Sequence, residues 1–356
     1  VAVGRITNEN HKVRQHTPGV APQGEGAENA GDTAQNTSPA PFSLSIPPLC
    51  GMLPKNIARQ RLKEFRVEEL KQTPLTGWHK AHKAKMAPFA GFEMPIQYEG
   101  IIAEHNHTRQ NCGIFDICHM GEFSLSGPGA KDALNSLVTQ DLDTLAPGKC
   151  RYGFLPNDKG GVLDDLIIYC LGQDDYMLVV NGACEAGDYS WLAGHLAAGP
   201  QFKNISDATG KIDVQGPRSL EVMEAVLGAP LRGLGYFNHQ RMQWNGASIL
   251  VSRTGYTGEL GYEIYLDSSL APAMWEALAA HPLVKPIGLG ARDTLRLELG
   301  YPLYGQDLDT VHTPVEAGYG MLLTTDGSLC NRLILPRWHL PMVYHVLLRG
   351  AVREDS

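Results

Sequence analysis

The sequence lacks several features that would place it in a common functional class. Its 356 residues contain no run of about 18 consecutive apolar residues, so no membrane-spanning helix is expected. The N-terminal region is polar and has no apolar segment typical of a secretory signal. Lysine and arginine form no run, and the formal net charge of -8 argues against general nucleic-acid binding. We therefore expect a cytoplasmic protein with no nucleic-acid and no membrane partner.

Metal and disulfide patterns are also missing. The seven cysteines are scattered and form no C-x-x-C pair, which indicates reduced thiols rather than a disulfide framework or a zinc site. His105 and His107 are two residues apart in a helix expected over 101–111, so they do not share a face. The sequence therefore predicts no metal site. It also contains neither a Walker A motif nor a G-x-G-x-x-G motif.

What is present divides the chain into three parts. Residues 1 to about 50 contain few large apolar groups, and residues 1–72 should be a disordered extension that ends in a short charged helix over 55–72. Residues 73–319 have apolar periodicity and frequent turn residues, which predicts the folded region. Residues 320–356 form a short hydrophobic and basic tail.

Two adjacent carboxylates lie inside an expected strand. Two glycines end a turn, and a β-branched and aliphatic run follows that contains Asp164 and Asp165. Successive side chains of a strand point to opposite faces, so one carboxylate should be solvated or cap the turn. The other should face the interior or a cleft, where it needs a polar partner. A turn-capping role and a role in a site are equally compatible with this pattern.

Two further residues in the first half have alternative roles. Asn181 ends a strand expected over 175–181, as a turn residue or as an amide directed at a ligand. Met120 lies in a strand expected over 112–127. Its thioether suits core packing, and it also suits contact with a flat ring.

The second half contributes a carboxylate and a guanidinium. Glu263 lies between aromatic neighbours in an expected strand, where an unpaired carboxylate is unfavourable. Arg292 lies near the start of an expected helix, where the helix dipole favours anions. We therefore expect Arg292 to have a specific partner elsewhere.

Eight short segments occur in the order and spacing of one known family. They are Thr73-Pro-Leu, Phe89-Ala-Gly-Phe-Glu-Met-Pro, Phe115-Asp-Ile-Cys-His-Met-Gly-Glu, Gly160-Gly-Val-Leu-Asp-Asp-Leu, Gln215-Gly-Pro, Arg253-Thr-Gly-Tyr-Thr-Gly-Glu, Gly288-Leu-Gly-Ala-Arg-Asp and Leu303-Tyr-Gly-Gln-Asp. With these segments the chain resembles aminomethyltransferase, the T-protein of the glycine cleavage system, from about Thr73 to about Tyr319.

The resemblance implies an α+β fold of mixed sheets, with helices around a central folate pocket. Residues 73–319 would form two intertwined α+β subdomains. The implied enzyme takes the aminomethyl group from the lipoyl arm of lipoylated H-protein, releases ammonia and forms 5,10-methylenetetrahydrofolate from tetrahydrofolate.

The resemblance also implies roles for individual residues. Asp165 matches the central carboxylate beside the reactive folate nitrogens. Pocket-lining positions of the family match Met120, Tyr152, Ile167, Asn181 and Tyr256, and folate-contacting positions match Glu263, Arg292 and Tyr301. Their chemistry suits a pterin, whose ring N–H donors can be accepted by a carboxylate and whose flat face suits aromatic and thioether groups.

Beyond about Tyr319 the resemblance stops, and residues 320–356 stand where the family has a C-terminal β-barrel domain. One alternative is therefore an inactive, truncated T-protein. Another is a non-catalytic folate-binding or assembly protein on the same scaffold, like the iron–sulfur repair relatives. Those relatives carry a Lys-Gly-Cys motif where this chain has Tyr301-Pro-Leu-Tyr-Gly-Gln, which favours the transferase. A flavin-linked demethylating enzyme is a third alternative, but no flavin-type glycine motif precedes the folded region.

Overall fold

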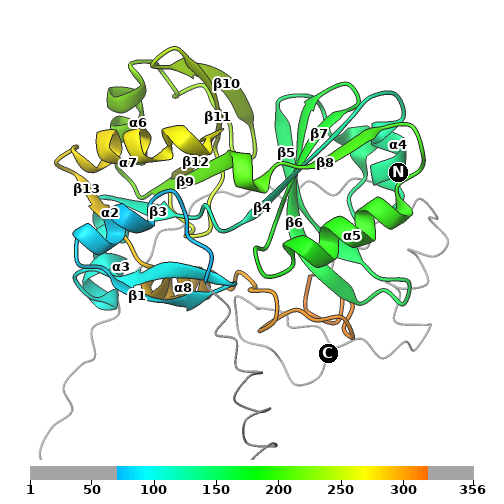
Figure 1. Cartoon of the computed structure of the whole chain (residues 1–356), viewed down its shortest axis with the longest axis horizontal. Helices are drawn as coiled ribbons and strands as arrows, with labels where there is room; N and C mark the ends of the chain where they lie inside the picture. The colour runs from blue at the N-terminus through cyan, green and yellow to red at the C-terminus, as the bar shows by residue number, and fades with distance from the viewer. Residues whose placement is uncertain (1–69, 320–356) are drawn as a thin grey trace, which may run out of the picture. The chain divides into compact units, whose positions relative to one another are not determined.

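The computed structural model describes residues 70–319 (Figure 1). The chain divides into two units, residues 1–66 and 67–356, and the described residues belong to the second. Most of the helix expected over 55–72 and all of the tail over 320–356 lie outside the described residues. Residues 70–72 are not helical, because Lys71 forms a β-bridge with Phe92. Within residues 70–319, every helix is too short or too polar to cross a membrane.

The first of two large sheets is mixed. Its strand order is β10-β11-β12-β9-β3-β13, and only the β13–β3 pair is parallel. The strands are β3 (Cys112–Asp116), β9 (Thr209–Gln215), β10 (His239–Trp244), β11 (Ala247–Ser252), β12 (Gly261–Asp267) and β13 (Val284–Pro286). We call it the β9 sheet.

The second large sheet is antiparallel throughout and has the order β5-β6-β7-β4-β8. Its strands are β4 (Gly121–Ser126), β5 (Lys149–Pro156), β6 (Val162–Gly172), β7 (Asp175–Val180) and β8 (Gln201–Asn204). We call it the β6 sheet. The expected pairing of the strand that carries the two aspartates with the strand over 175–181 is confirmed.

Helices and a small hairpin complete the described region. The hairpin consists of β1 (Lys85–Phe89) and β2 (Phe92–Gln97). The helices are α2 (Thr76–Ala81), α3 (Ile101–Gln110), α4 (Ala130–Asn135), α5 (Glu185–His195), α6 (Ser219–Leu227), α7 (Ala271–Ala279) and α8 (Leu289–Glu298), with short 3-10 turns η1 (Leu142–Thr144), η2 (Ser206–Ala208) and η3 (Ser268–Leu270). The α+β class is therefore confirmed.

Side-chain alternation explains how the layers form. On β9, Ile212 and Val214 point outward into an apolar core shared with α6 and α7. On β6, Leu166 and Ile168 point outward into a second core shared with α4 and α5. Figure 1 shows these helix pairs on the outer side of each sheet. The remaining faces of the two sheets meet in a third core, which includes Tyr169 of β6 and Tyr265 of β12, among other residues.

The single strand expected over 112–127 is wrong. The chain forms β3 and β4, which belong to different sheets, and His119 and Met120 lie in the turn between them. The carboxylate of Asp116 accepts a hydrogen bond from the backbone N–H of Cys118 (2.9 Å), an aspartate-centred turn that ends β3. The turn places Met120 where the two sheets meet.

Candidate functional site

The two adjacent aspartates of β6 point to opposite faces, as the alternation predicts. Asp165 lies on the same face as Ile167 and Tyr169, which is the face directed at the β9 sheet. Asp164 lies on the same face as Leu166 and points toward α5. The structure thus gives a reason, independent of the family resemblance, to single out Asp165 as the aspartate of the inter-sheet space.

The expectation that one of the two is solvated or caps the turn is wrong, because Asp164 is buried and accepts its hydrogen bonds from Asn181. Asp164 is fully buried and Asp165 is half-buried. The β6–β7 register, with Ile167 opposite Val179, brings Asn181 to the level of Asp165. The amide nitrogen of Asn181 is 2.8 Å from Asp164 Oδ1 and 2.8 Å from Asp165 Oδ1. One amide therefore fixes both carboxylates, and Asn181 is more than a turn residue.

Two more groups complete this aspartate cluster. The hydroxyl of Tyr152, on the neighbouring strand β5, donates to Asp165 Oδ2 at 3.0 Å. On the other side, Asp188 of α5 is 3% exposed and lies close enough to Asp164 to feel its charge. The result is a chain of polar contacts from Asp188 through Asp164 and Asn181 to Asp165 and Tyr152.

Burial and mutual repulsion raise the pKa values in this cluster. For Asp165, burial and then the charge of Asp164 raise the pKa to about 7, although the bonds from Tyr152 and Asn181 act in the other direction. Burial and Asp164 raise the pKa of Asp188 to about 10, so Asp188 carries a proton at neutral pH. A carboxyl with a pKa near neutral pH can exchange a proton or hold a charge there.

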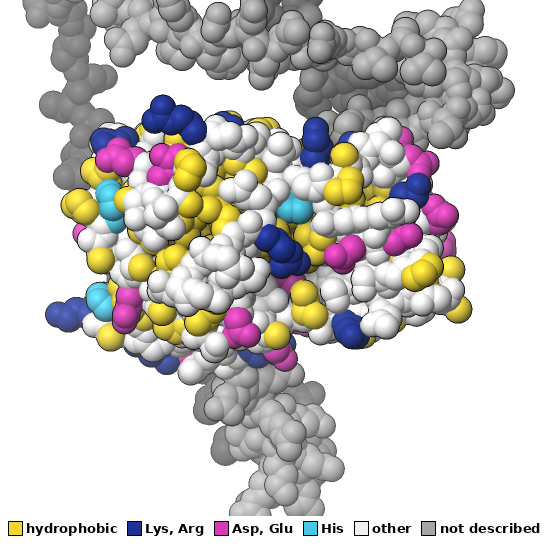
Figure 2. Space-filling model, turned by 90° about the horizontal axis from the view of Figure 1, so that it is seen from above, with side chains coloured by type: hydrophobic (Ala, Val, Ile, Leu, Met, Phe, Trp, Pro, Cys, Tyr) yellow, Lys and Arg dark blue, Asp and Glu magenta, His cyan; other side chains and the backbone are white. Residues whose placement is uncertain are grey.

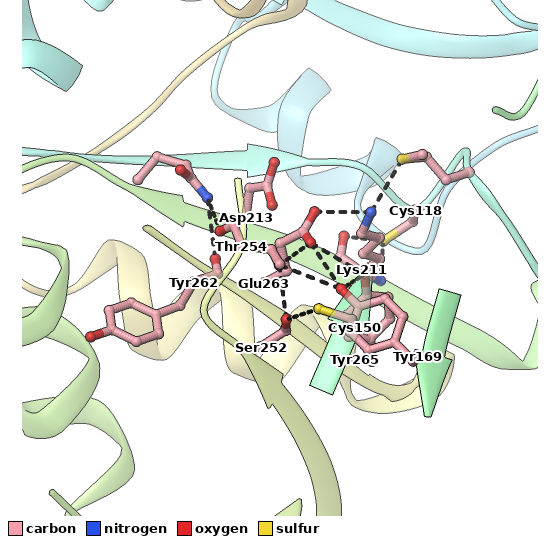
Figure 3. A network of polar contacts seen from close by, with 12 residues as sticks. Cys118, Cys150, Tyr169, Lys211, Asp213, Ser252, Thr254, Tyr262, Glu263 and Tyr265 are labelled. Atoms are coloured by element: carbon pink, nitrogen blue, oxygen red, sulfur yellow. Dashed lines mark hydrogen bonds and ion pairs between the residues drawn. The ribbon is translucent and has the colours of Figure 1, made fainter. Parts of the chain in front are cut away.

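A second polar cluster surrounds Glu263 of β12 (Figure 3). Glu263 is 3% exposed, and its Oε1 lies 3.0 Å from Lys211 Nζ of β9. Its Oε2 accepts hydrogen bonds from the hydroxyls of Thr254 and Tyr169. Burial alone would raise the pKa of Glu263, but the Lys211 charge and hydrogen bonds, among them the one from Thr254, outweigh burial and lower the pKa to about 2. Glu263 is therefore a buried carboxylate that stays charged.

The specific partner expected for Arg292 is Asp213 of β9. The distance from Arg292 Nη1 to Asp213 Oδ2 is 2.6 Å, and Asp213 is fully buried. The guanidinium carbon lies 4.8 Å from the ring centroid of Tyr256, whose ring stacks on Tyr301 at 5.9 Å. Arg292, Tyr256 and Tyr301 thus form one stack, and Asp213 anchors its basic end.

The loop that carries Tyr256 is held in place by close packing. A Cβ atom at Gly255 or Gly261 would lie about 2 Å from the side chain of Gln215, so only glycine fits there. Gln215 in turn donates to the backbone oxygen of Thr254 at 3.2 Å. From α3, Arg109 donates to the backbone oxygen of Thr257 at 2.6 Å. These contacts explain why the sequence concentrates glycine at this loop.

The structure brings the nine sequence-predicted residues to the space between the sheets and to the loops beside it. Four come from the β6 sheet or its ends: Tyr152, Asp165, Ile167 and Asn181. Met120 precedes β4, and Glu263, Arg292, Tyr256 and Tyr301 come from β12, α8 and adjoining loops. Asp165 and Tyr169, which contacts Glu263, are four residues apart on one strand, or about 13 Å.

Sequence reasoning missed three charged residues of the two clusters. Lys211 and Asp213 alternate with Ile212 and Val214 along β9, a charged face in a central strand that is itself a detectable signal. Asp188 left no such signal, because a single aspartate in a helix is usually exposed.

Two buried carboxylate oxygens near the site, Asp213 Oδ1 and Glu122 Oε1, lack a hydrogen-bond partner among the described residues. A cleft of about 270 Å³ lies beside the Tyr256 loop and is lined by Thr254, Arg253 and Tyr301, among others. A larger cleft of about 350 Å³ is lined by α6 residues and lies away from the aspartate cluster. In residues 70–319, no three or more His, Cys, Asp or Glu side chains are arranged to hold a metal ion.

The face of the molecule shown in Figure 2 carries no large patch of a single charge sign. On the face in Figure 2, acidic and basic side chains are interspersed with hydrophobic and polar ones.

Comparison with known proteins gives consistent matches. Residues 75–327 match the family described as the GCVT N-terminal domain. An aminomethyltransferase of Flavobacterium psychrophilum is 42% identical over 291 residues, 81% of this chain and 81% of that protein. One from Halothermothrix orenii is 44% identical over 262 residues, 73% of each chain. The crystal structure of glycine cleavage system aminomethyltransferase T from Bartonella henselae is similar with a TM-score of 0.66 and 35% identity, covering 69% of this chain and 67% of that one.

An α+β fold that encloses two buried acidic clusters, together with these relatives, defines the class of the protein as a transferase. More narrowly, the chain belongs to the aminomethyltransferase family, which confirms the resemblance seen in the sequence.

Proposed function

We propose that the chain is a tetrahydrofolate-dependent aminomethyltransferase of the glycine cleavage system. It would take the aminomethyl group from the lipoyl arm of lipoylated H-protein, release ammonia and give 5,10-methylenetetrahydrofolate. The single observation that carries the proposal is Asp165, a half-buried carboxylate fixed by Tyr152 and Asn181 with a pKa of about 7.

In this proposal, Asp165 stabilises developing positive charge and exchanges a proton. Tetrahydrofolate, when bound, supplies the nitrogens that receive the one-carbon group. The ionised form of Asp165 stabilises positive charge that develops beside it, and a fixed carboxylate does so without reorganisation. Its protonated form can donate a proton, because a pKa of about 7 leaves both forms populated at neutral pH.

The second cluster would hold the ring system. Glu263 is charged and can accept ring N–H donors, while the remaining N–H groups of Arg292 can serve a carbonyl acceptor. Tyr256 and Tyr301 provide the stacked faces that suit a flat ring. Met120 and Ile167 are half-buried and supply apolar contact between the clusters.

The test is an assay of ammonia release from aminomethyl-loaded H-protein, with and without tetrahydrofolate. We expect release to depend on tetrahydrofolate and to fall strongly in Asp165→Asn, while the exposed control Asp158→Asn keeps full activity. Absence of tetrahydrofolate-dependent release by the folded parent would refute the proposal. Folate binding without any release would instead support a non-catalytic folate-binding protein.

A further inference from the structure

Among the described residues, Lys211 is the one buried lysine. It is 1% exposed, in the middle of a central strand. Lysine is almost never fully buried unless it is paired. Its neighbour Ile212 points to the helix-covered face, so Lys211 points into the space between the sheets. The strand therefore places an ammonium group in the interior of the site.

The contacts of the Lys211 ammonium group are with residues of the inter-sheet site. Its Nζ lies 3.0 Å from Glu263 Oε1, 3.3 Å from Met120 Sδ and 5.3 Å from the ring centroid of Tyr265 (Figure 3). Two of these three partners, Glu263 and Met120, are residues that the sequence had already singled out. Lys211 therefore acts on the site through residues that are candidates for ligand contact.

We propose that Lys211 is a positioning residue: its ammonium group keeps Glu263 ionised and thereby makes Glu263 an acceptor for the ring N–H donors of a bound folate. The reference to folate rests on the proposed function. The effect of Lys211 on the charge of Glu263 is independent of that function.

The surroundings of Glu263 explain why one cation is decisive. The titratable and charged groups that face Glu263 come from six parts of the chain: Lys211 and Asp213 of β9, Tyr265 of β12, Tyr169 of β6, Cys150 of β5, Glu122 of β4 and Tyr236 before β10. Of the two basic residues Lys211 and Arg292, Lys211 contacts Glu263, whereas Arg292 pairs with Asp213.

Two of those neighbours are themselves buried acids. The pKa of Glu122 is raised to about 8 by burial, against the effect of Lys211, and that of Asp213 is raised to about 7 by burial and by Glu263. Without Lys211, Glu263 would remain among these acids with no cation from residues 70–319 in contact. A buried carboxyl in that position gains a proton. A protonated carboxyl donates one bond itself and can no longer accept two N–H donors side by side.

The first test needs no folate. Lys211→Met keeps the unbranched stem but removes the charge, and the exposed Lys203→Met is the matched control. Glutamate carboxyl carbons are followed by ¹³C NMR from about pH 4 to about pH 9, with Glu263 assigned through Glu263→Gln. We expect Glu263 to stay ionised throughout in the parent and in Lys203→Met, and to titrate within this range in Lys211→Met. A Glu263 that stays ionised in Lys211→Met would overturn the proposal.

The second test measures tetrahydrofolate affinity by calorimetry against pH. In Lys211→Met the affinity should fall about tenfold for each pH unit below the new pKa of Glu263 and recover above it. The double variant Lys211→Met with Glu263→Gln should bind no more weakly than Glu263→Gln alone. A loss in Lys211→Met that does not change with pH would identify a packing role and overturn the proposal.

Two further outcomes remain decisive. If the parent binds no tetrahydrofolate, the proposed function fails, while the NMR titration still decides whether Lys211 sets the charge of Glu263. If Lys211→Met does not fold, the double variant resolves the cause, since removing both partners of a buried pair avoids an uncompensated charge. Folding of the double variant supports the proposal, and its failure to fold shows that Lys211 is needed for packing and contradicts it.

Discussion

The inner face of each large sheet carries a carboxylate of the site, and the two carboxylates differ in the charge of their neighbours. Asp165 lies beside a second aspartate and has only neutral donors, Tyr152 and Asn181. Glu263 has the same kind of neutral donors but also Lys211 at 3.0 Å. As a result, the pKa is about 7 for Asp165 and about 2 for Glu263.

This difference separates two tasks within one site. A group that titrates near neutral pH is suited to proton transfer, and a group that remains charged is suited to holding a ligand. Burial by itself raises the pKa of both carboxyls, so burial does not determine the role. The charge of the neighbouring side chain determines the role.

The largest effect is expected from removing the titrating carboxylate. Asp165→Asn should lower kcat by roughly 10²- to 10⁴-fold, the usual contribution of a positioned acid or base, while tetrahydrofolate affinity changes much less. Steady-state assays with loaded H-protein measure the first quantity and calorimetry the second. Full turnover by Asp165→Asn would eliminate the role of this residue.

Neutralising Glu263, the carboxylate that stays charged, should affect tetrahydrofolate binding more than turnover. Glu263→Gln should weaken tetrahydrofolate binding by roughly 10- to 100-fold, because hydrogen bonds to a charged group are worth about 1.5–3 kcal/mol. The control is Glu276→Gln, an exposed position on α7. Unchanged affinity in calorimetry would show that Glu263 does not contact the ligand.

A smaller effect concerns the pH profile. The pKa of Asp165 is raised, so its ionised form is lost as the pH falls through about 7, and turnover should fall with it. Asp164→Asn removes the neighbouring charge and should move this acid limb lower by roughly one pH unit. The measurement is kcat/KM against pH. A limb that stays in place would show that Asp164 does not influence Asp165.

The smallest effect is a shift of the acid limb in the opposite direction. The Tyr152 hydroxyl donates to Asp165 and favours its ionised form. Tyr152→Phe should therefore move the acid limb to higher pH by roughly a few tenths of a unit. One full pKa unit corresponds to about 1.4 kcal/mol, so the hydrogen bond accounts for only a fraction of that free energy. The same assay detects the shift. A shift to lower pH would contradict the assigned direction of this hydrogen bond.

The local part of this arrangement is visible in the sequence. Strand alternation predicted that Asp164 and Asp165 point to opposite faces, and the strand pairing that brings Asn181 near them was also predicted. The prediction that one aspartate is solvated or caps the turn was wrong, because α5 covers that face and contributes Asp188.

The non-local part could not be read from the sequence. Lys211 and Glu263 are brought together by the register of β9 against β12, in which Asp213 lies opposite Glu263. Such a register depends on the whole sheet, so the partner of a buried charge is not predictable from the pattern around it. The turn at Met120 was missed for a related reason, since β3 and β4 separate into different sheets.

The most direct test of this account is a ¹³C titration of the side-chain carboxyl carbons in the unmodified protein, with Asp165 and Glu263 followed in the same sample. We expect Asp165 to titrate near pH 7 and Glu263 to be still ionised well below its ordinary pKa, close to pH 2 or the acid unfolding limit. If both carboxyls titrate together near their ordinary values of about 4, neighbouring charge does not separate their roles, and the division of tasks proposed for this site is incorrect.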